Sequence, residues 1–200
     1  MLIECVEKAR LDDDYVSGET FTNEDIGLFD FSKQEFKQVT FERCDFTECN
    51  MKKCAFYECT FSHCSFIKCT MNEGFLRDCR FETCRLDTSD LVNMHIRQTV
   101  FENCSAVYAN FTETAFEGVS FEGCCMKNAV LGKVTLKKTK FRKCDLTNAE
   151  FYRTMLKGID LSSCVITGIT VSDNFSELRG TVIDYGQCPD IAVMLGIKIK

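Results

Sequence analysis

The sequence of 200 residues predicts an all-β fold, a four-sided parallel β-solenoid of about eight coils that ends in a short helix and strand. Three observations predict it. An apolar residue occupies every fifth position from Phe21 to Val171, and we call these residues the centres. A small or apolar residue stands two positions before each centre from Val39 onward, and similar residues also recur every twenty positions.

The period of five defines the repeating unit. It matches neither the 3.6-residue period of a helix nor the two-residue period of a strand. All 31 centres are apolar and 15 of the 18 phenylalanines are centres, so the pattern sets the fold. Between the inward columns stand mostly charged and polar residues such as Glu42, Arg43 and Asp45. Each unit is therefore expected to be a short extended segment followed by a bend, with two side chains inward and three outward.

The period of twenty defines the coil. Four units of five residues fill one period, so each coil is expected to have four sides, with like residues stacked on like. The residues of this core ladder are Phe41, Phe61, Phe81, Phe101, Phe121 and Phe141, with Cys44, Cys64, Cys84, Cys104, Cys124, Cys144 and Cys164. With neighbouring strands ~4.8 Å apart, the rod is expected to be roughly 37 Å long.

Most of the 15 cysteines fall in the small inward column, where a thiol acts as a small buried hydrophobe. Neighbours in the ladder would have Cβ atoms ~4.8 Å apart, beyond the usual reach of a disulfide. Their C-x₄-C spacing also differs from that of zinc sites. We therefore expect free, packed thiols, with Cys5, Cys125 and Cys188 outside the column as the candidates for reactivity.

Three segments are expected: an N-terminal cap over residues 1–20, the solenoid over 21–175 and a C-terminal module over 176–200. In that module Pro189 suits the first turn of a helix, and Ile191, Met194 and Leu195 share one helix face. Ile197 and Ile199 then alternate as a strand. The module either caps the last coil or also joins two copies of the chain.

The charge pattern offers a candidate surface. The net charge of −6 argues against direct binding to nucleic acid, and residues 1–100 alone carry −7. One outward column, the acidic column, contains Glu42, Glu82, Glu102 and Glu122, with Ser62 at the missing rung. It either imitates a row of phosphates or forms a solvated face neutralised by Arg43, Arg80 and Arg142. Another side carries Lys37, Arg77, Arg97, Lys137, Lys138 and Lys157.

No motif of an enzyme is present. The two histidines, His63 and His95, fall at outward positions, and the chain lacks the common catalytic, nucleotide-binding and metal-binding motifs. A core filled by side chains leaves no cavity for a ligand. We expect no enzymatic activity, cofactor or metal. The lack of a signal-peptide core or a long apolar run predicts a cytoplasmic protein that does not contact membranes.

The units "CDFTE", "CTFSH", "CDLTN" and "AEFYR" resemble the pentapeptide-repeat family, whose consensus is A(D/N)LXX with Leu or Phe at the centre. The resemblance covers residues 21–171. It implies the family's fold, a right-handed quadrilateral β-helix.

The C-terminal segment "ELRGTVIDYGQCPDIAVMLGIKIK" is similar to the end of the quinolone-resistance and gyrase-protection branch of that family. The matching residues are Leu178, Gly180, Ile183, Asp184, Gln187, Leu195, Gly196 and Ile197. The resemblance implies a DNA-mimicking homodimer that binds DNA gyrase or topoisomerase IV and protects it from a quinolone or a gyrase-targeting toxin. The dimer interface would contain Leu178, Ile183, Ile191, Met194, Leu195, Ile197 and Ile199.

One feature departs from that branch. Many quinolone-resistance members interrupt the repeat with loops that touch the topoisomerase, whereas this register is unbroken from Phe21 to Val171. The alternative function is therefore a structural or scaffolding solenoid for an unrelated regulatory protein.

Overall fold

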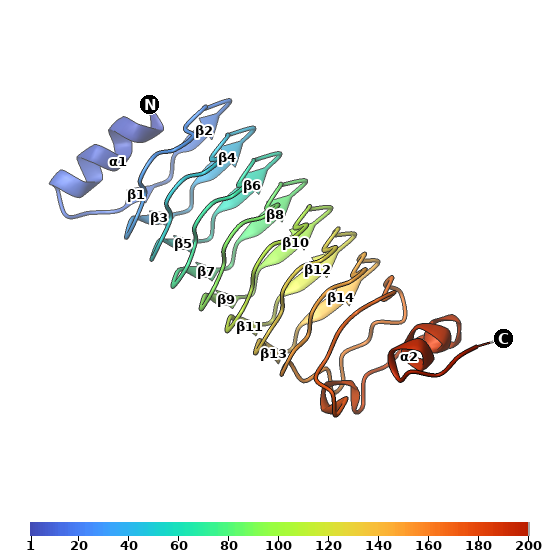
Figure 1. The fold of residues 1–200 in the computed structure, drawn as a ribbon. Helices are drawn as coiled ribbons and strands as arrows, with labels where there is room; N and C mark the ends of the chain where they lie inside the picture. The colour runs from blue at the N-terminus through green and yellow to red at the C-terminus, as the bar shows by residue number, and fades with distance from the viewer. Residues whose placement is uncertain (200) are drawn as a thin grey trace.

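The computed structural model describes residues 1–199, which form a rod of stacked coils with one helix at each end (Figure 1). Helix α1, Leu2–Leu11, lies at the N-terminal end, and helix α2, Cys188–Met194, at the C-terminal end. Short 3-10 helices at Ser176–Leu178 and Tyr185–Gln187 lead into α2. Within the described chain, neither α-helix has the length and apolar character needed to cross a bilayer.

Two faces of the rod are parallel sheets of seven strands each. The first contains β1 Val16–Ser17, β3 Glu35–Lys37, β5 Ala55–Tyr57, β7 Phe75–Arg77, β9 His95–Arg97, β11 Ala115–Glu117 and β13 Thr135–Lys137. The second contains β2 Thr20–Thr22, β4 Thr40–Glu42, β6 Thr60–Ser62, β8 Arg80–Glu82, β10 Val100–Glu102, β12 Ser120–Glu122 and β14 Lys140–Arg142. Every pair is in register at a separation of twenty residues, as for Phe81 and Phe101.

The other two faces are held by single parallel bridges at the same twenty-residue spacing. One series runs from Asp25 to Val165 and the other from Asp30 to Thr170. The expected four-sided parallel β-solenoid is therefore confirmed. Each sheet contains seven strands, slightly fewer than the eight coils expected. No strand follows β14 in the described chain.

A left-handed residue makes each corner. From Asn23 to Gly158, every residue two positions after a centre has a positive φ. The backbone N–H of most of these residues donates to the next coil, as Thr83 does to the carbonyl oxygen of Glu102 at 2.9 Å. Most corner residues are not glycine, although an L-residue is strained in this conformation by roughly 1–2 kcal/mol. The repeated pairing between coils overrides that strain.

The corners predict a stabilising substitution. Thr83 is β-branched at φ +54°, whereas Asn occupies the equivalent corner at Asn103. Because Asn tolerates the left-handed region better, Thr83→Asn should raise the free energy of unfolding by about 0.5–1 kcal/mol, measured by urea denaturation. The control is Thr60→Asn in strand β6, which should stabilise nothing. Equal effects of the two substitutions would contradict this account.

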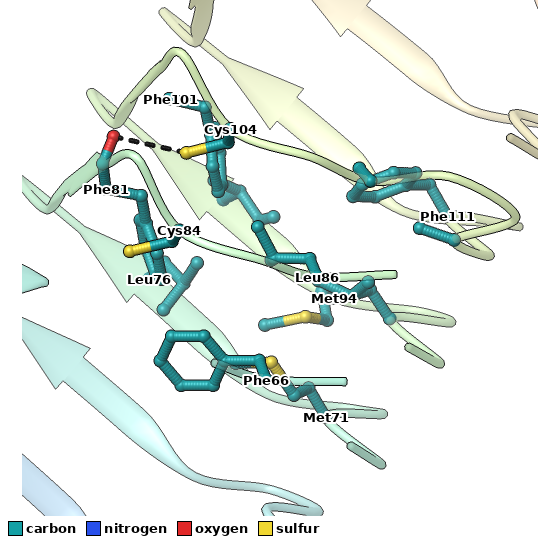
Figure 2. Close-up of a cluster of buried hydrophobic side chains, with 14 of the residues drawn as sticks. Phe66, Met71, Leu76, Phe81, Cys84, Leu86, Met94, Phe101, Cys104 and Phe111 are labelled. Atoms are coloured by element: carbon teal, nitrogen blue, oxygen red, sulfur yellow. Dashed lines mark hydrogen bonds between the residues drawn. The ribbon is translucent and has the colours of Figure 1, made fainter. Parts of the chain in front are cut away.

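The core is a stack of centres along the rod axis. Phe41 and Phe61 stack with ring centroids 4.9 Å apart, and Phe101 lies 4.8 Å from Phe81 and 4.9 Å from Phe121. Rings on adjacent sides can meet edge to face, as Phe61 and Phe66 do, a favourable aromatic geometry that fills the square interior. Figure 2 shows part of this buried core around Phe66, Phe81 and Phe101. Leu136 and Val171 are the centres that are only half-buried, and both lie near the C-terminal end.

The two ends are closed differently. Helix α1 buries Leu2, Val6 and Ala9 against the first coil, which begins with β1 inside the segment expected to be a cap. At the other end, α2 begins with Pro189 in its first turn, as the sequence predicts. Residues 197–199 form no strand in this chain, contrary to expectation. Ile197 N–H donates instead to the carbonyl oxygen of Ala192 in α2 at 2.9 Å, and Ile197 and Ile199 are exposed.

Candidate functional site

The acidic column lies on the second sheet, at the last residue of each strand. Pairing of β8, β10 and β12 places Glu82, Glu102 and Glu122 directly opposite one another. Glu42 on β4 continues the column beyond Ser62 on β6. The carboxylates thus stack along one edge of the rod, on rigid strands.

Arginines pair with every carboxylate of this column. Arg43 Nη1 lies 2.6 Å from Glu42, Arg80 contacts both Glu82 and Glu102, and Arg142 lies 3.9 Å from Glu122. Between a third and a half of each glutamate side chain is exposed, so each pair is worth only about 0–1 kcal/mol. The column is therefore partly neutralised and does not present bare negative charges.

A cationic and aromatic column lies on the first sheet. Lys37, Arg77 and Arg97 occupy corresponding positions of β3, β7 and β9, with Tyr57 between the first two. Lys37 Nζ lies 3.5 Å from the ring centre of Tyr15, and the guanidinium of Arg77 lies 5.3 Å from that of Tyr57. Such contacts attract a cation to the face of an aromatic ring. Farther along the same column Glu117 on β11 pairs with Arg97 at 3.3 Å and with Lys137, so cations predominate on this face but do not stand alone.

The inward thiols are free and packed. Twelve cysteines are buried, Cys5 and Cys125 are half-buried and Cys188 is exposed. Each thiol of the core ladder from Cys44 to Cys144 donates a weak hydrogen bond to the carbonyl oxygen of a phenylalanine on the preceding coil. Figure 2 shows one, from Cys104 to Phe81 at 3.5 Å. Packing and this donor role both suit a small thiol at these positions.

Glu177 is a buried acid that links the C-terminal module to the solenoid. Its side chain is fully buried and accepts hydrogen bonds from the backbone N–H of Arg153 at 2.8 Å and from both the N–H and the hydroxyl of Ser172. Burial alone would raise the pKa of Glu177, but the hydrogen bonds outweigh it and hold that pKa below its usual value. Glu177 thus ties the end of the solenoid to the module.

Asp184 and Gln187 close the last coil. The Asp184 carboxylate accepts from the N–H of Gly186 at 2.8 Å, and the Gln187 carbonyl oxygen accepts from the N–H of Asp184 at 2.7 Å, which makes a capping box. The Gln187 amide donates to the carbonyl oxygens of Leu161 and Cys164. Asp184 and Gln187 therefore satisfy backbone groups at the end of the rod.

The residues expected at a dimer interface divide into two sets. Leu178, Ile183, Ile191 and Met194 pack partly buried against the core of the same chain. Leu195, Ile197 and Ile199 are about half exposed, and Tyr185 and Val193 join them with exposures of 91% and 64%. We call these five exposed residues the C-terminal apolar patch. Large exposed apolar patches often mark interaction surfaces, so these residues are candidates for one.

Sequence reasoning missed Glu177 and Tyr185. Glu177 falls at an outward-looking polar position just beyond the repeat, so no pattern marks it as buried. Tyr185 stands between the two residues of the capping box, and its exposure follows from that local geometry. A buried acid can be found only once the segment that covers it has been placed.

These features define a class, the four-sided parallel β-solenoids built from five-residue units. The family model described as "Pentapeptide repeat region" matches residues 39–111 and 75–151. The chain therefore belongs to the pentapeptide-repeat family. No curated protein matches it.

The solved structures that match this chain are distant in sequence. QnrB1, a plasmid-mediated fluoroquinolone resistance protein, is 18% identical over 90% of this chain and 99% of its own, with a TM-score of 0.45. HetL, a pentapeptide-repeat protein involved in heterocyst differentiation regulation from Nostoc sp. strain PCC 7120, is 13% identical over 90% of this chain and 96% of its own, with a TM-score of 0.44. These similarities concern the fold alone.

Proposed function

We propose that this protein binds DNA gyrase or topoisomerase IV as a homodimer, mimics DNA, and protects the enzyme from a quinolone or a gyrase-targeting toxin. The C-terminal module carries the proposal. Its residues Leu178, Gly180, Asp184 and Gln187 resemble those of the gyrase-protection branch, and the geometry gives each a place at the end of the rod. The C-terminal apolar patch supplies a surface for a second copy.

The uneven distribution of charge along the rod supports the same arrangement. Residues 1–100 carry a net charge of −7, whereas residues 101–200 carry +1. Two copies joined at their C-terminal ends would place the acidic halves outward. An elongated dimer with acidic arms is a suitable competitor for a surface that binds DNA.

A supercoiling assay tests the protective function. Purified protein should restore supercoiling by gyrase in the presence of a fluoroquinolone, and the concentration needed reports the affinity. Neutralising Glu82, Glu102 and Glu122 to glutamine should abolish the protection if the acidic column docks. The matched control neutralises Glu48, Glu58 and Glu113, which lie elsewhere. Equal protection by the two triple variants would exclude the acidic column as the docking face.

The homodimer has a separate test. Light scattering should give twice the chain mass of 22.8 kDa, and Leu195→Glu with Ile197→Glu should give the monomer mass, because a buried unpaired carboxylate is costly. Leu28→Glu is the control, since Leu28 is 77% exposed far from the module. A dimer that survives the double substitution would contradict the proposed interface.

A scaffold for an unrelated regulatory protein is the second candidate. The pairing of each glutamate in the acidic column with Arg43, Arg80 or Arg142 favours it, because a phosphate mimic should leave its charges free. A protein that dimerises but neither binds gyrase nor restores supercoiling at micromolar concentration would support the scaffold.

A further inference from the structure

The ladder of backbone hydrogen bonds is interrupted at one position in the rod. The N–H of Gly118 donates to the backbone carbonyl oxygen of Lys137, and that of Gly123 to the carbonyl oxygen of Arg142. These bonds join β13 and β14 to the preceding coil. Within residues 1–199, no backbone-to-backbone hydrogen bond joins either strand to residues 155–163 of the following coil. β13 and β14 therefore present unpaired strand edges inside the solenoid.

On these two sides the backbone of residues 155–163 pairs with the C-terminal segment, and the one link to β14's end in the described part of the chain is the Ser163 hydroxyl, which accepts from the N–H of Lys143 at 3.1 Å. Gly158 N–H donates to Gly180 at 2.8 Å, and Asp160 bridges to Val182. On the other two sides the coil stays in the ladder, since Val165 N–H donates to Cys144 at 2.9 Å and Thr170 N–H to Ala149 at 3.0 Å. In the described chain the last coil is thus unpaired from the preceding coil along two of its four sides.

The opening is a cleft of about 690 Å³ between β14 and residues 158–163. We call it the inter-coil cleft. Lys138, Lys140, Arg142 and Lys143 line it, against the single carboxylate of Asp160. Within residues 1–199 the three lysines form no ion pair, and Arg142 is 3.9 Å from Glu122. The cleft therefore has a strong excess of positive charge in a protein of net charge −6.

The hydroxyl of Thr139, in the wall of the cleft, has no hydrogen-bond partner in the described chain. Its side chain is only 6% exposed, lines the cleft, and is the one buried side-chain polar group in the described residues without a hydrogen bond. Hydroxyls at the equivalent inward position elsewhere are all satisfied, as Thr99 is by Arg97 at 2.8 Å and Thr114 by Leu91 at 2.6 Å. A buried hydroxyl without a partner is costly, and a ligand in the cleft would supply one.

We propose that the inter-coil cleft binds an extended acidic peptide segment of a protein partner, which adds a strand to the unpaired edge of β14. A peptide has the alternating N–H and C=O groups that this edge requires, as in other cases of strand addition. A nucleic acid shares the negative charge but lacks such a backbone. Acidic side chains would pair with Lys138, Lys140, Arg142 and Lys143. This inference does not depend on binding to gyrase.

The test uses the full-length protein and a fluorescein-labelled peptide of alternating Glu and Thr, about eight residues long, as in a typical strand. Fluorescence anisotropy should show saturable binding. The same peptide with alternate backbone nitrogens methylated keeps its charge but cannot donate to a strand edge, and should bind about tenfold more weakly. Equal binding of the two peptides would overturn strand addition.

Substitutions locate the site. Lys140→Glu with Arg142→Glu should weaken binding about tenfold or more, and Lys33→Glu with Lys53→Glu, the same charge change elsewhere, should not. Lys138→Glu with Lys143→Glu provides a second test if the first variant fails to fold. Thr139→Val should weaken binding about fivefold, the loss of one hydrogen bond. Binding of a single-stranded oligonucleotide with the same sensitivity, and none of the peptide, would overturn the proposal.

Discussion

Replacing Phe101 with alanine is expected to lower the free energy of unfolding by about 3–5 kcal/mol. Phe101 is 1% exposed and lies in the middle of the rod, stacked on Phe81 and Phe121. Removal of the ring leaves a cavity that rigid neighbouring coils cannot fill. Because each coil of a solenoid contacts only its neighbours, the gap should also weaken the coupling between the two halves.

Urea unfolding followed by circular dichroism measures both effects, and separation of the transition into two steps would report the lost coupling. The control is Phe75→Ala, because Phe75 lies on β7 outside the buried core and should cost less than about 1 kcal/mol. Phe101→Leu should cost less than Phe101→Ala, since leucine serves as a centre at Leu86 and Leu131. Similar losses for Phe101→Ala and Phe75→Ala would contradict a continuous core.

The repeat made the body of the fold predictable from the sequence. All the centres share one five-residue register, so a single weakly apolar centre such as Ala106 does not alter the predicted register. The spacing of Phe81 and Phe101 by twenty residues directly gives their pairing in β8 and β10. The corner conformation could not be read in the same way, because few corners carry the glycine that usually signals a left-handed residue.

The candidate site was less predictable for two physical reasons. The sequence places Arg80 near the acidic column, but only side-chain geometry shows that it contacts both Glu82 and Glu102. The opening beside Thr139 depends on how residues 155–163 divide their pairing between the preceding coil and the C-terminal segment. The repeat continues through those residues, so its pattern alone predicts a closed ladder there.

The C-terminal strand illustrates a different limit. The alternation of Ile197 and Ile199 is typical of a strand, yet a strand forms only beside a partner edge. In the described chain residues 197–199 pair with no strand, and both side chains are about half exposed. If a second copy of the chain supplies a strand edge, residues 197–199 can form the strand that their alternation predicts. Such pairing would suit the proposed homodimer, which joins two copies at their C-terminal ends.

Alkaline pH is expected to destabilise the protein strongly. Burial raises the pKa of the thiols of Cys54 and Cys69 to about 12, and that of Cys49 to about 11. The unfolded chain releases these protons near the ordinary thiol pKa of about 8.5, whereas the folded chain keeps them. Above that pH the unfolded state binds fewer protons, so stability falls as pH rises, by about 1.4 kcal/mol per pH unit for each thiol. The full stabilisation is present below pH ~8.5 and is lost as the pH rises toward 12.

Thermal unfolding under reducing, oxygen-free conditions at a series of pH values measures this loss. The melting temperature should vary little from pH 7 to 8 and fall steeply above 9. Cys54→Ala with Cys69→Ala isolates the thiols from lysines and tyrosines that also titrate, and alanine fits because Ala109, Ala129 and Ala149 fill the same inward position. This variant should lose less stability than the original chain between pH 7 and 10.5. Parallel losses in the two proteins would show that the thiols do not govern alkaline unfolding.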